Sequence, residues 1–145
     1  MSSVSSMSSM SSKSRMIVGV GIDAVSIERV RRAAGETPGG LRFRARVFTD
    51  GERRVCETRK DPAECFAARF AAKEAVMKAL GAEGIAFSFR EIEVVRAASG
   101  APAIVLHGRV AARARDLGIA AIHVSLTHAE PLALASVIAE TAGDA

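Results

Sequence analysis

The stretch from residue 66 to residue 81 has the alternation of hydrophobic and polar positions that is typical of a helix. It is rich in Ala, Leu, Met, Lys, Arg and Glu, and Gly81 ends it. Four apolar residues share one side of the helical wheel, which should be buried: Phe66, Phe70, Met77 and Leu80. Glu74 and Lys78 follow at one-turn steps on the edge of that side. They form either an ordinary i,i+4 salt bridge or part of a functional site, because a half-buried carboxylate needs compensation.

The rest of the chain predicts short strands and helices in alternation. Strands are expected at residues 17–22, 91–96, 103–106, 121–127 and 132–139, with a hairpin turn at Ser99-Gly100. Helices are expected after an N-cap at Ser26, over residues 50–60 with Thr49 as cap, over 62–80 with Pro62 in the first turn, and over 109–117. Because most strands are joined as hairpins, we predict an α+β fold, a mostly antiparallel sheet with helices packed on one face.

A second acidic residue stands where the first predicted strand should end. Asp23 follows the apolar run 17–22, and Arg29 lies in the helix after Ser26. By itself, Asp23 is typical of a turn or a cap. Together with Glu74 it offers two carboxylate ligands, the number that Mg²⁺ commonly takes from protein while its other positions hold water and substrate phosphates.

Composition narrows the class of protein. A chain of 145 residues with 49% hydrophobic content forms one domain with a core. No apolar run approaches the roughly 18 residues of a membrane span, and residues 1–15, nearly all Ser and Met, lack the apolar region of a signal peptide. We interpret residues 1–15 as a flexible tail and residues 16–145 as the folded domain. The absence of Trp and Tyr argues against a stacking surface for single-stranded nucleic acid.

The two cysteines, Cys56 and Cys65, have no metal-like spacing and no secretory signal precedes them. We therefore expect reduced thiols in a cytoplasmic protein. The net charge of +4 is spread unevenly, with Arg29, Arg31 and Arg32 in a helix, Arg42, Arg44 and Arg46 in an expected linker, and Arg53, Arg54, Arg59 and Lys60 after it. These charges form either a solvated surface or an electrostatic dock for an acidic partner.

Three motifs in this order and spacing resemble those of the holo-acyl carrier protein synthase family, the small phosphopantetheinyl transferases. Residues 21–23 match its G-I/L-D turn, and residues 69–79 match its R/K-F-A-A-K-E-A-x-x-K-A helix. Residues 123–128 match its H-V-S-I/L/V-S/T-H segment. The resemblance extends from Met16 to about Glu140.

The resemblance implies a Mg²⁺-dependent transfer of the 4′-phosphopantetheine arm from coenzyme A to a serine of an acidic apo-acyl carrier protein, releasing adenosine 3′,5′-bisphosphate. Asp23 and Glu74 would hold Mg²⁺, with Lys78 as a positive charge beside them and Glu74 as the preferred base. The expected contacts to coenzyme A are Lys78, Arg69, Gly81, Ser125 and His128, and the expected docking residues for the carrier are Arg29 and Arg42. The family's small members are homotrimers with sites between neighbouring chains, so we expect the same here, with His128 acting across an interface.

Two positions depart from the family pattern. Glu83 stands in the loop 81–84, where relatives more often have G-T-G, and Ala129 stands where a polar or acidic residue is common. The glycines of that loop are equally typical of a helix C-cap and turn. His123 is expected to be structural, and His107 to lie on the surface.

Two other function classes compete with this interpretation. One is a magnesium-dependent phosphohydrolase or nucleotide-binding enzyme that uses the same acids on water. The other is a non-catalytic basic module that binds an acidic protein or RNA.

Overall fold

The computed structural model describes residues 14–82 and 84–143, so the tail expected over residues 1–15 lies almost wholly outside the described residues, as does Glu83. The three long strands form one antiparallel sheet in the order β1-β5-β4: β1 (Ile17–Ser26), β4 (Ile119–Ala129) and β5 (Leu132–Thr141). The strands β2 (Ile92–Arg96) and β3 (Pro102–Leu106) form a separate antiparallel hairpin. The predicted α+β class and antiparallel pairing are confirmed.

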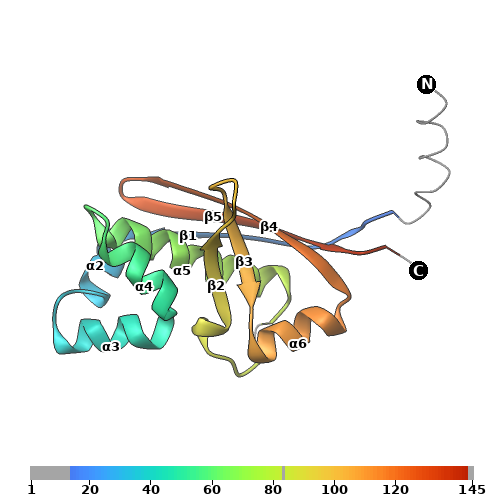
Figure 1. Cartoon of the computed structure of the whole chain (residues 1–145), viewed down its shortest axis with the longest axis horizontal. Coiled ribbons are helices and arrows are strands. Elements are labelled where there is room, and N and C mark those ends of the chain that lie inside the picture. The colour runs from blue at the N-terminus through green and yellow to red at the C-terminus, as the bar shows by residue number, and fades with distance from the viewer. Residues whose placement is uncertain (1–13, 83, 144–145) are drawn as a thin grey trace.

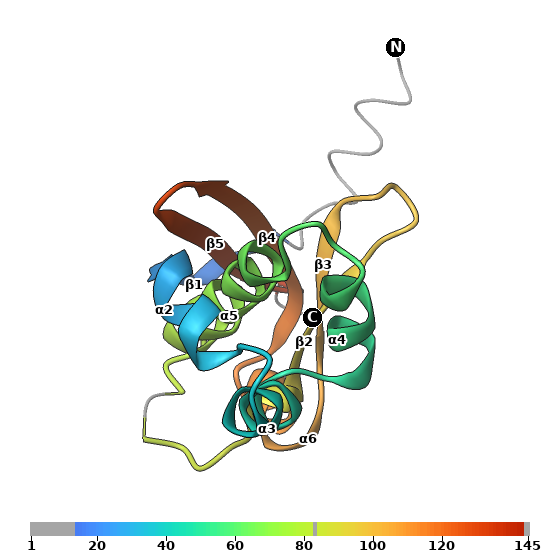
Figure 2. The same cartoon turned by 90° about the vertical axis from the view of Figure 1, so that its left-hand side faces the viewer.

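The helices lie on one side of the three-stranded sheet (Figure 1). They are α2 (Ile27–Ala33), α3 (Pro38–Val47), α4 (Asp50–Glu57), α5 (Pro62–Ala79) and α6 (Gly108–Asp116), with a 3₁₀ turn, η1, at Phe89–Glu91. Figure 2 shows α5 against the sheet with α2 beside it, while α4 packs near the β2–β3 hairpin. The long helix α5 is therefore the element around which the others are arranged.

Local sequence signals set several helix boundaries as predicted. Ser26 accepts a hydrogen bond from the backbone of Arg29, and Thr49 forms a capping box with Glu52. Pro62 occupies the first turn of α5 after the cap Asp61. At the other end, Gly81 adopts a φ of 57°, which permits the reversal that ends the helix.

Other boundaries differ from those expected. Strand β1 continues past residue 22 to Ser26, because β5 supplies backbone partners up to Leu132, and Asp23 therefore lies inside the strand opposite Ala135. The segment with Arg42, expected to be a linker, belongs to helix α3. Thr37 caps that helix and Pro38 opens it, a start signal that its two following glycines obscure. Helix α4 ends at Glu57 rather than near residue 60.

Helix α5 is buried on more sides than the wheel predicted. Besides Phe66 and Leu80, its alanines and Val76 are enclosed, whereas Phe70 and Met77 are only half-buried. The helix lies unusually close to β1 because that strand presents glycines. A Cβ atom built on Gly21 would lie 1.9 Å from the carbonyl oxygen of Ala75, and one built on Gly19 would lie 1.9 Å from that of Ala79. Only glycine permits this approach of strand and helix backbones.

The expectation of two free thiols is wrong. Cys56, at the end of α4, and Cys65, in α5, are joined by a disulfide, with their Cα atoms 5.3 Å apart. Sequence spacing could not reveal this pairing, because it depends on how the turn after α4 folds back onto α5. Across residues 14–82 and 84–143, no helix is both long and apolar enough to cross a membrane.

Candidate active site

The close contact between β1 and α5 brings the two predicted acids to one place. Asp23 lies two positions after the buried Gly21 on β1, so the two share a face of the strand, and Asp23 also faces α5. Lys78 reaches across from α5, and its Nζ atom lies 3.1 Å from Asp23 Oδ1 and 3.0 Å from the carbonyl oxygen of Ile22. Of the two alternatives for Glu74 and Lys78, the i,i+4 salt bridge does not form within the described part of the chain, since Lys78 pairs with Asp23 instead.

Glu74 occupies an electrostatically unfavourable position for a carboxylate. Burial raises its pKa above the ordinary value, and the negative charge of Asp23 raises it further, while Lys78 and Arg29 oppose the shift. Two neighbouring carboxylates, one of them half-buried, form a donor set of hard oxygens that suits Mg²⁺. The residues present thus fit the metal that the sequence implied.

A groove of about 490 Å³ opens beside these acids. Its polar lining includes Asp23, Glu74, Ser26 and Arg29, and its apolar lining includes Val30, Ala33, Phe43 and Phe70. Arg29 therefore shares one surface with the acid pair. Arg42 is exposed on α3, next to Phe43 in sequence, but does not line the groove. The groove combines a charged end with an apolar wall.

A second pocket, of about 400 Å³, lies between the start of α5 and the end of β4, and we call it the cationic pocket. It brings together Arg69 and His128 from the sequence prediction with Arg59 and Lys60. Burial lowers the pKa of Arg69, and the neighbouring Arg59 and Arg96 lower it further, although Glu52 opposes the shift. The Nε atom of Arg69 is buried without a hydrogen-bond partner among the described residues. Such a concentration of positive charge suits a phosphate-bearing ligand.

Arg59 and Lys60 were part of a recognised charge run but received no role in the sequence prediction. Their signal was the run itself, which precedes the helix cap at Asp61. What the sequence could not reveal is that the turn before α5 brings them into one pocket with Arg69 of that helix.

Three carboxylates at this pocket have oxygens within 4.8 Å of one another: Asp61 and Glu64, which line it, and Glu130. They already have cationic neighbours. Arg31 lies 2.9 Å from Asp61 and 3.8 Å from Glu130, and His128 Nδ1 lies 3.3 Å from Glu64. This cluster is distinct from the predicted magnesium pair, and Arg31 offsets part of its negative charge.

Gly81 and Ser125 lie apart from both cavities. Gly81 belongs to the turn after α5, where Arg113 donates to the carbonyl of Leu80 at 3.1 Å. Ser125 is exposed between Val124 and Leu126, which pack on the core, so it points to the opposite face of the sheet. Within one chain, Ser125 does not join Arg69 and His128. His123, on the same face, pairs with Glu140 across the strands, and His107 pairs with Glu93.

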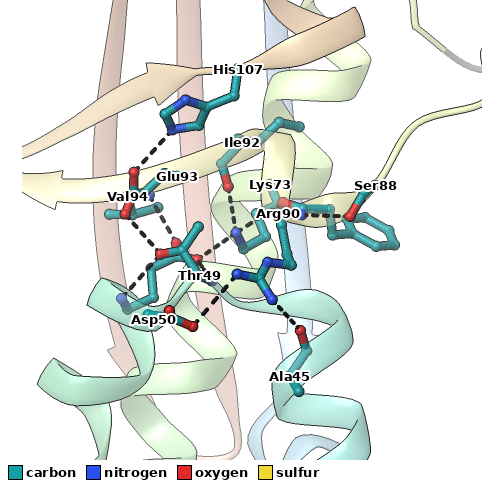
Figure 3. Close-up of polar contacts among 12 residues, drawn as sticks. Ala45, Thr49, Asp50, Lys73, Ser88, Arg90, Ile92, Glu93, Val94 and His107 are labelled. Atoms are coloured by element: carbon teal, nitrogen blue, oxygen red, sulfur yellow. Dashed lines mark hydrogen bonds and ion pairs between the residues drawn. The ribbon is translucent and has the colours of Figure 1, made fainter.

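One buried charge near the site was missed by the sequence analysis. Lys73 is fully buried, and its Nζ lies 2.7 Å from Glu52, also fully buried, and 3.0 Å from the carbonyl of Phe89. Glu52 in turn accepts from the backbone of Val94 at 2.8 Å. Figure 3 shows Lys73 at the junction of the helices with the β2 segment, close to Ile92. The signal for its burial was that three of the four residues one turn from Lys73 are apolar: Phe70, Val76 and Met77.

A family model described as the 4′-phosphopantetheinyl transferase superfamily matches residues 19–133. Among curated proteins, the chain is 47% identical over 131 residues to a holo-acyl-carrier-protein synthase of Anaeromyxobacter sp. (strain K), covering 88% of this chain and 99% of that protein. It is 49% identical over 130 residues to one of Methylobacterium radiotolerans, covering 86% of this chain and 94% of that protein.

Solved structures agree with these matches. The holo-acyl-carrier-protein synthase of Neisseria meningitidis superposes with a TM-score of 0.76 at 34% identity, covering 87% of this chain and all (100%) of that one. The enzyme of Helicobacter pylori, solved in complex with coenzyme A, superposes with a TM-score of 0.70 at 29% identity, covering 83% and 98%.

Proposed function

The chain belongs to the 4′-phosphopantetheinyl transferase superfamily, and on that premise we propose that it transfers the 4′-phosphopantetheine arm of coenzyme A to a serine hydroxyl of an apo-acyl carrier protein. The observation that carries the proposal is the convergence of Asp23 and Glu74, which line the groove, with Lys78, which pairs with Asp23. Adenosine 3′,5′-bisphosphate would be the second product. The carrier's serine oxygen forms a bond to the phosphorus next to the arm, and the pyrophosphate bond breaks.

Asp23 and Glu74 would hold Mg²⁺, which when bound neutralises charge on the pyrophosphate and its leaving group. Lys78 lies beside Asp23 and offers an ammonium to a pyrophosphate oxygen. The raised pKa of Glu74 also suits it to accept the serine proton, since a base works best with a pKa closer to the operating pH. Positioning and charge neutralisation would supply most of the rate enhancement.

We assign the nucleotide end of coenzyme A to the cationic pocket. Arg69 and His128 are its predicted contacts, and Arg59 and Lys60 add further positive charge. Arg69 lines the pocket and would offer its guanidinium group to a phosphate there. Gly81, in the turn at the far end of α5, lies apart from this pocket and is not part of this assignment.

Arg29 is proposed to receive the acidic carrier, because it lies on the groove that contains the acid pair. The exposed Arg42 would extend that basic surface along α3. A carrier docked here would present its serine to Glu74 from the open side of the groove. A cytoplasmic location stays a prediction.

We also propose a homotrimer in which the uncovered face of the three-stranded sheet contacts two further copies. Val20 is 65% exposed and Ile22 is 63% exposed on that face, an apolar surface that one chain leaves in water. Ser125 shares the face and would join a site only through a neighbouring chain. Light scattering should give three times the chain mass; an active monomer would contradict the shared-site arrangement.

The test of transfer is the intact mass of an apo-acyl carrier protein after incubation with the chain, coenzyme A and Mg²⁺. A gain of one phosphopantetheine arm that disappears with EDTA and in Glu74→Gln is expected. Breakdown of coenzyme A without carrier would instead indicate a phosphohydrolase, and an unmodified carrier that still binds would indicate a non-catalytic module. Ala129→Asp, assayed in parallel, tests whether the departure at that position limits turnover.

A further inference from the structure

The disulfide lies in the wall of the cationic pocket. Cys56 is fully buried at the end of α4, whereas Cys65 is half-buried on α5 and lines the pocket directly. A reagent entering the pocket therefore meets the Cys65 sulfur and not that of Cys56.

The bridge closes the segment that supplies much of the pocket's charge. Cys56 and Cys65 are nine positions apart, and Arg59, Lys60, Asp61 and Glu64 all fall between them and line the pocket. Arg59 and Lys60 are exposed, and no salt bridge fixes either side chain within residues 14–82 and 84–143. The disulfide is thus the one covalent restraint on the turn that carries these two cations, beside the backbone hydrogen bond from Arg59 to Cys56 and the Arg31–Asp61 ion pair.

The same sulfur contacts the arginine at the centre of the pocket. Arg69 donates from its NH1 group to Cys65 Sγ at 2.9 Å, one turn along α5. A change in the state of Cys65 therefore reaches Arg69 directly. A thiolate there would compete with a bound phosphate for the guanidinium.

We propose that Cys56 and Cys65 form a thiol–disulfide exchange site that sets the affinity of the chain for coenzyme A, with the disulfide form binding more tightly. The inference rests on the proposed function, because it takes the cationic pocket as the nucleotide site. In the disulfide form, Arg59 and Lys60 are held near the ligand. In the dithiol form, they must be ordered on binding.

The reductant is a small thiol, and the exchange proceeds in two steps. Its thiolate attacks Cys65 Sγ, forming a mixed disulfide and releasing Cys56 as a thiolate that takes up a proton. A second thiol attacks the outer sulfur of the mixed disulfide and releases Cys65. Two thiols are oxidised to one disulfide, and the protein gains two electrons and two protons. A nucleotide in the pocket would cover Cys65 and slow the first step.

The reduced form should bind coenzyme A more weakly because Arg59 and Lys60 are then less restrained before binding. Ordering two long cationic side chains at an interface weakens binding by about fivefold to tenfold. The affinity for the carrier protein should not change, because neither cysteine lines its proposed groove.

The test compares the full chain after oxidation by glutathione disulfide and after reduction by dithiothreitol. Alkylation and intact mass count the thiols, which is unambiguous because the chain has only two cysteines. Calorimetry then gives the Kd of coenzyme A for each form. The matched control is the Cys56→Ala/Cys65→Ala double variant, which should bind like the reduced form in either condition. Adenosine 3′,5′-bisphosphate should slow the reduction of the wild-type bridge.

A fivefold or larger rise in Kd on reduction, absent in the double variant, supports the inference. Failure of the bridge to form, or an equal Kd for both forms, overturns it while leaving the proposed function intact. If neither form binds coenzyme A, the proposed function itself is wrong, whatever the thiol count.

Discussion

Lys78 and Asp23, 55 positions apart in sequence, form an ion pair at 3.1 Å that joins α5 to β1. Glu74, one turn before Lys78, is left without an ionic partner in the described part of the chain. The two acids and one lysine leave a negative charge in the groove, which Arg29 offsets only at a distance. This imbalance is the physical reason to expect a cation between β1 and α5.

The pH dependence of the metal effect follows from Glu74. Because burial and Asp23 raise its pKa, the folded chain holds the proton more tightly than the unfolded chain does. Glu74 thus contributes stability below its ordinary pKa, and that contribution is lost as pH rises through the raised pKa. Mg²⁺ should offset the loss, so the increase in Tm on adding Mg²⁺, measured at a series of pH values, should grow as pH rises through the raised pKa of Glu74.

Glu74→Gln is the matched control for that measurement. It keeps the shape of the side chain and removes its charge, so its Tm should respond little to Mg²⁺ at any of these pH values. Turnover should fall by at least about a hundredfold. A wild-type Tm that Mg²⁺ leaves unchanged at high pH would contradict a metal site at these acids.

The sequence predicted which residues meet in the candidate active site better than how they pair. The motifs marked Asp23, Glu74 and Lys78, but helix geometry suggested only the partner one turn away on the same helix. The pairing of Lys78 with Asp23 depends on the approach of β1, which the glycines opposite Ala75 and Ala79 permit. Nothing within either segment alone encodes that distance.

Long-range contacts explain the other differences as well. The sequence predicts a linker around Arg44, whereas the structure has a helix there. The Arg44 side chain is buried over Phe66 and donates to the carbonyl of Ala34 at 2.7 Å. Its burial and its partners come from three other segments. The Cys56–Cys65 bond likewise depends on tertiary structure. The spacing of the cysteines and the expected cellular compartment therefore could not predict it.

The buried pair of Lys73 and Glu52 predicts a strong and asymmetric effect on stability. Lys73→Met leaves the Glu52 carboxylate buried with backbone donors but no cation, which should cost about 3–5 kcal/mol of unfolding free energy. The double variant Glu52→Gln/Lys73→Met should recover a large part of that loss, since neither charge then remains. Urea unfolding measures the free energy of unfolding of the single and the double variant. The control is Lys60→Met, at an exposed lysine, which should change stability by about 0.5 kcal/mol or less. Equal losses in the single and double variants would contradict the pair's role.

The close packing of Gly21 against α5 should affect both stability and catalysis. Gly21→Ala places a methyl group against the carbonyl of Ala75, so β1 must move away from α5, at about 1–3 kcal/mol. Asp23 moves with the strand, and kcat should therefore fall as well. Gly39→Ala is the matched control, because its nearest neighbour is the flexible end of Arg42 at 3.7 Å, and stability there should hold or rise slightly. If both variants kept full activity and stability, the close approach would not be what positions Asp23.

The position of Arg29 on the groove leads us to expect that its charge affects binding of the carrier protein and not of coenzyme A. Arg29→Glu reverses a charge at the groove's edge, so the KM for the acidic carrier should rise about tenfold, while the KM for coenzyme A should change little. The effect should shrink as salt screens the attraction. Arg115→Glu alters the net charge equally on the exposed surface of α6, away from the groove, and separates local docking from overall charge. Steady-state kinetics with each substrate varied in turn measures both constants. Equal increases in the carrier KM for the two variants would mean that net charge, and not the position of Arg29 beside Glu74, governs the encounter.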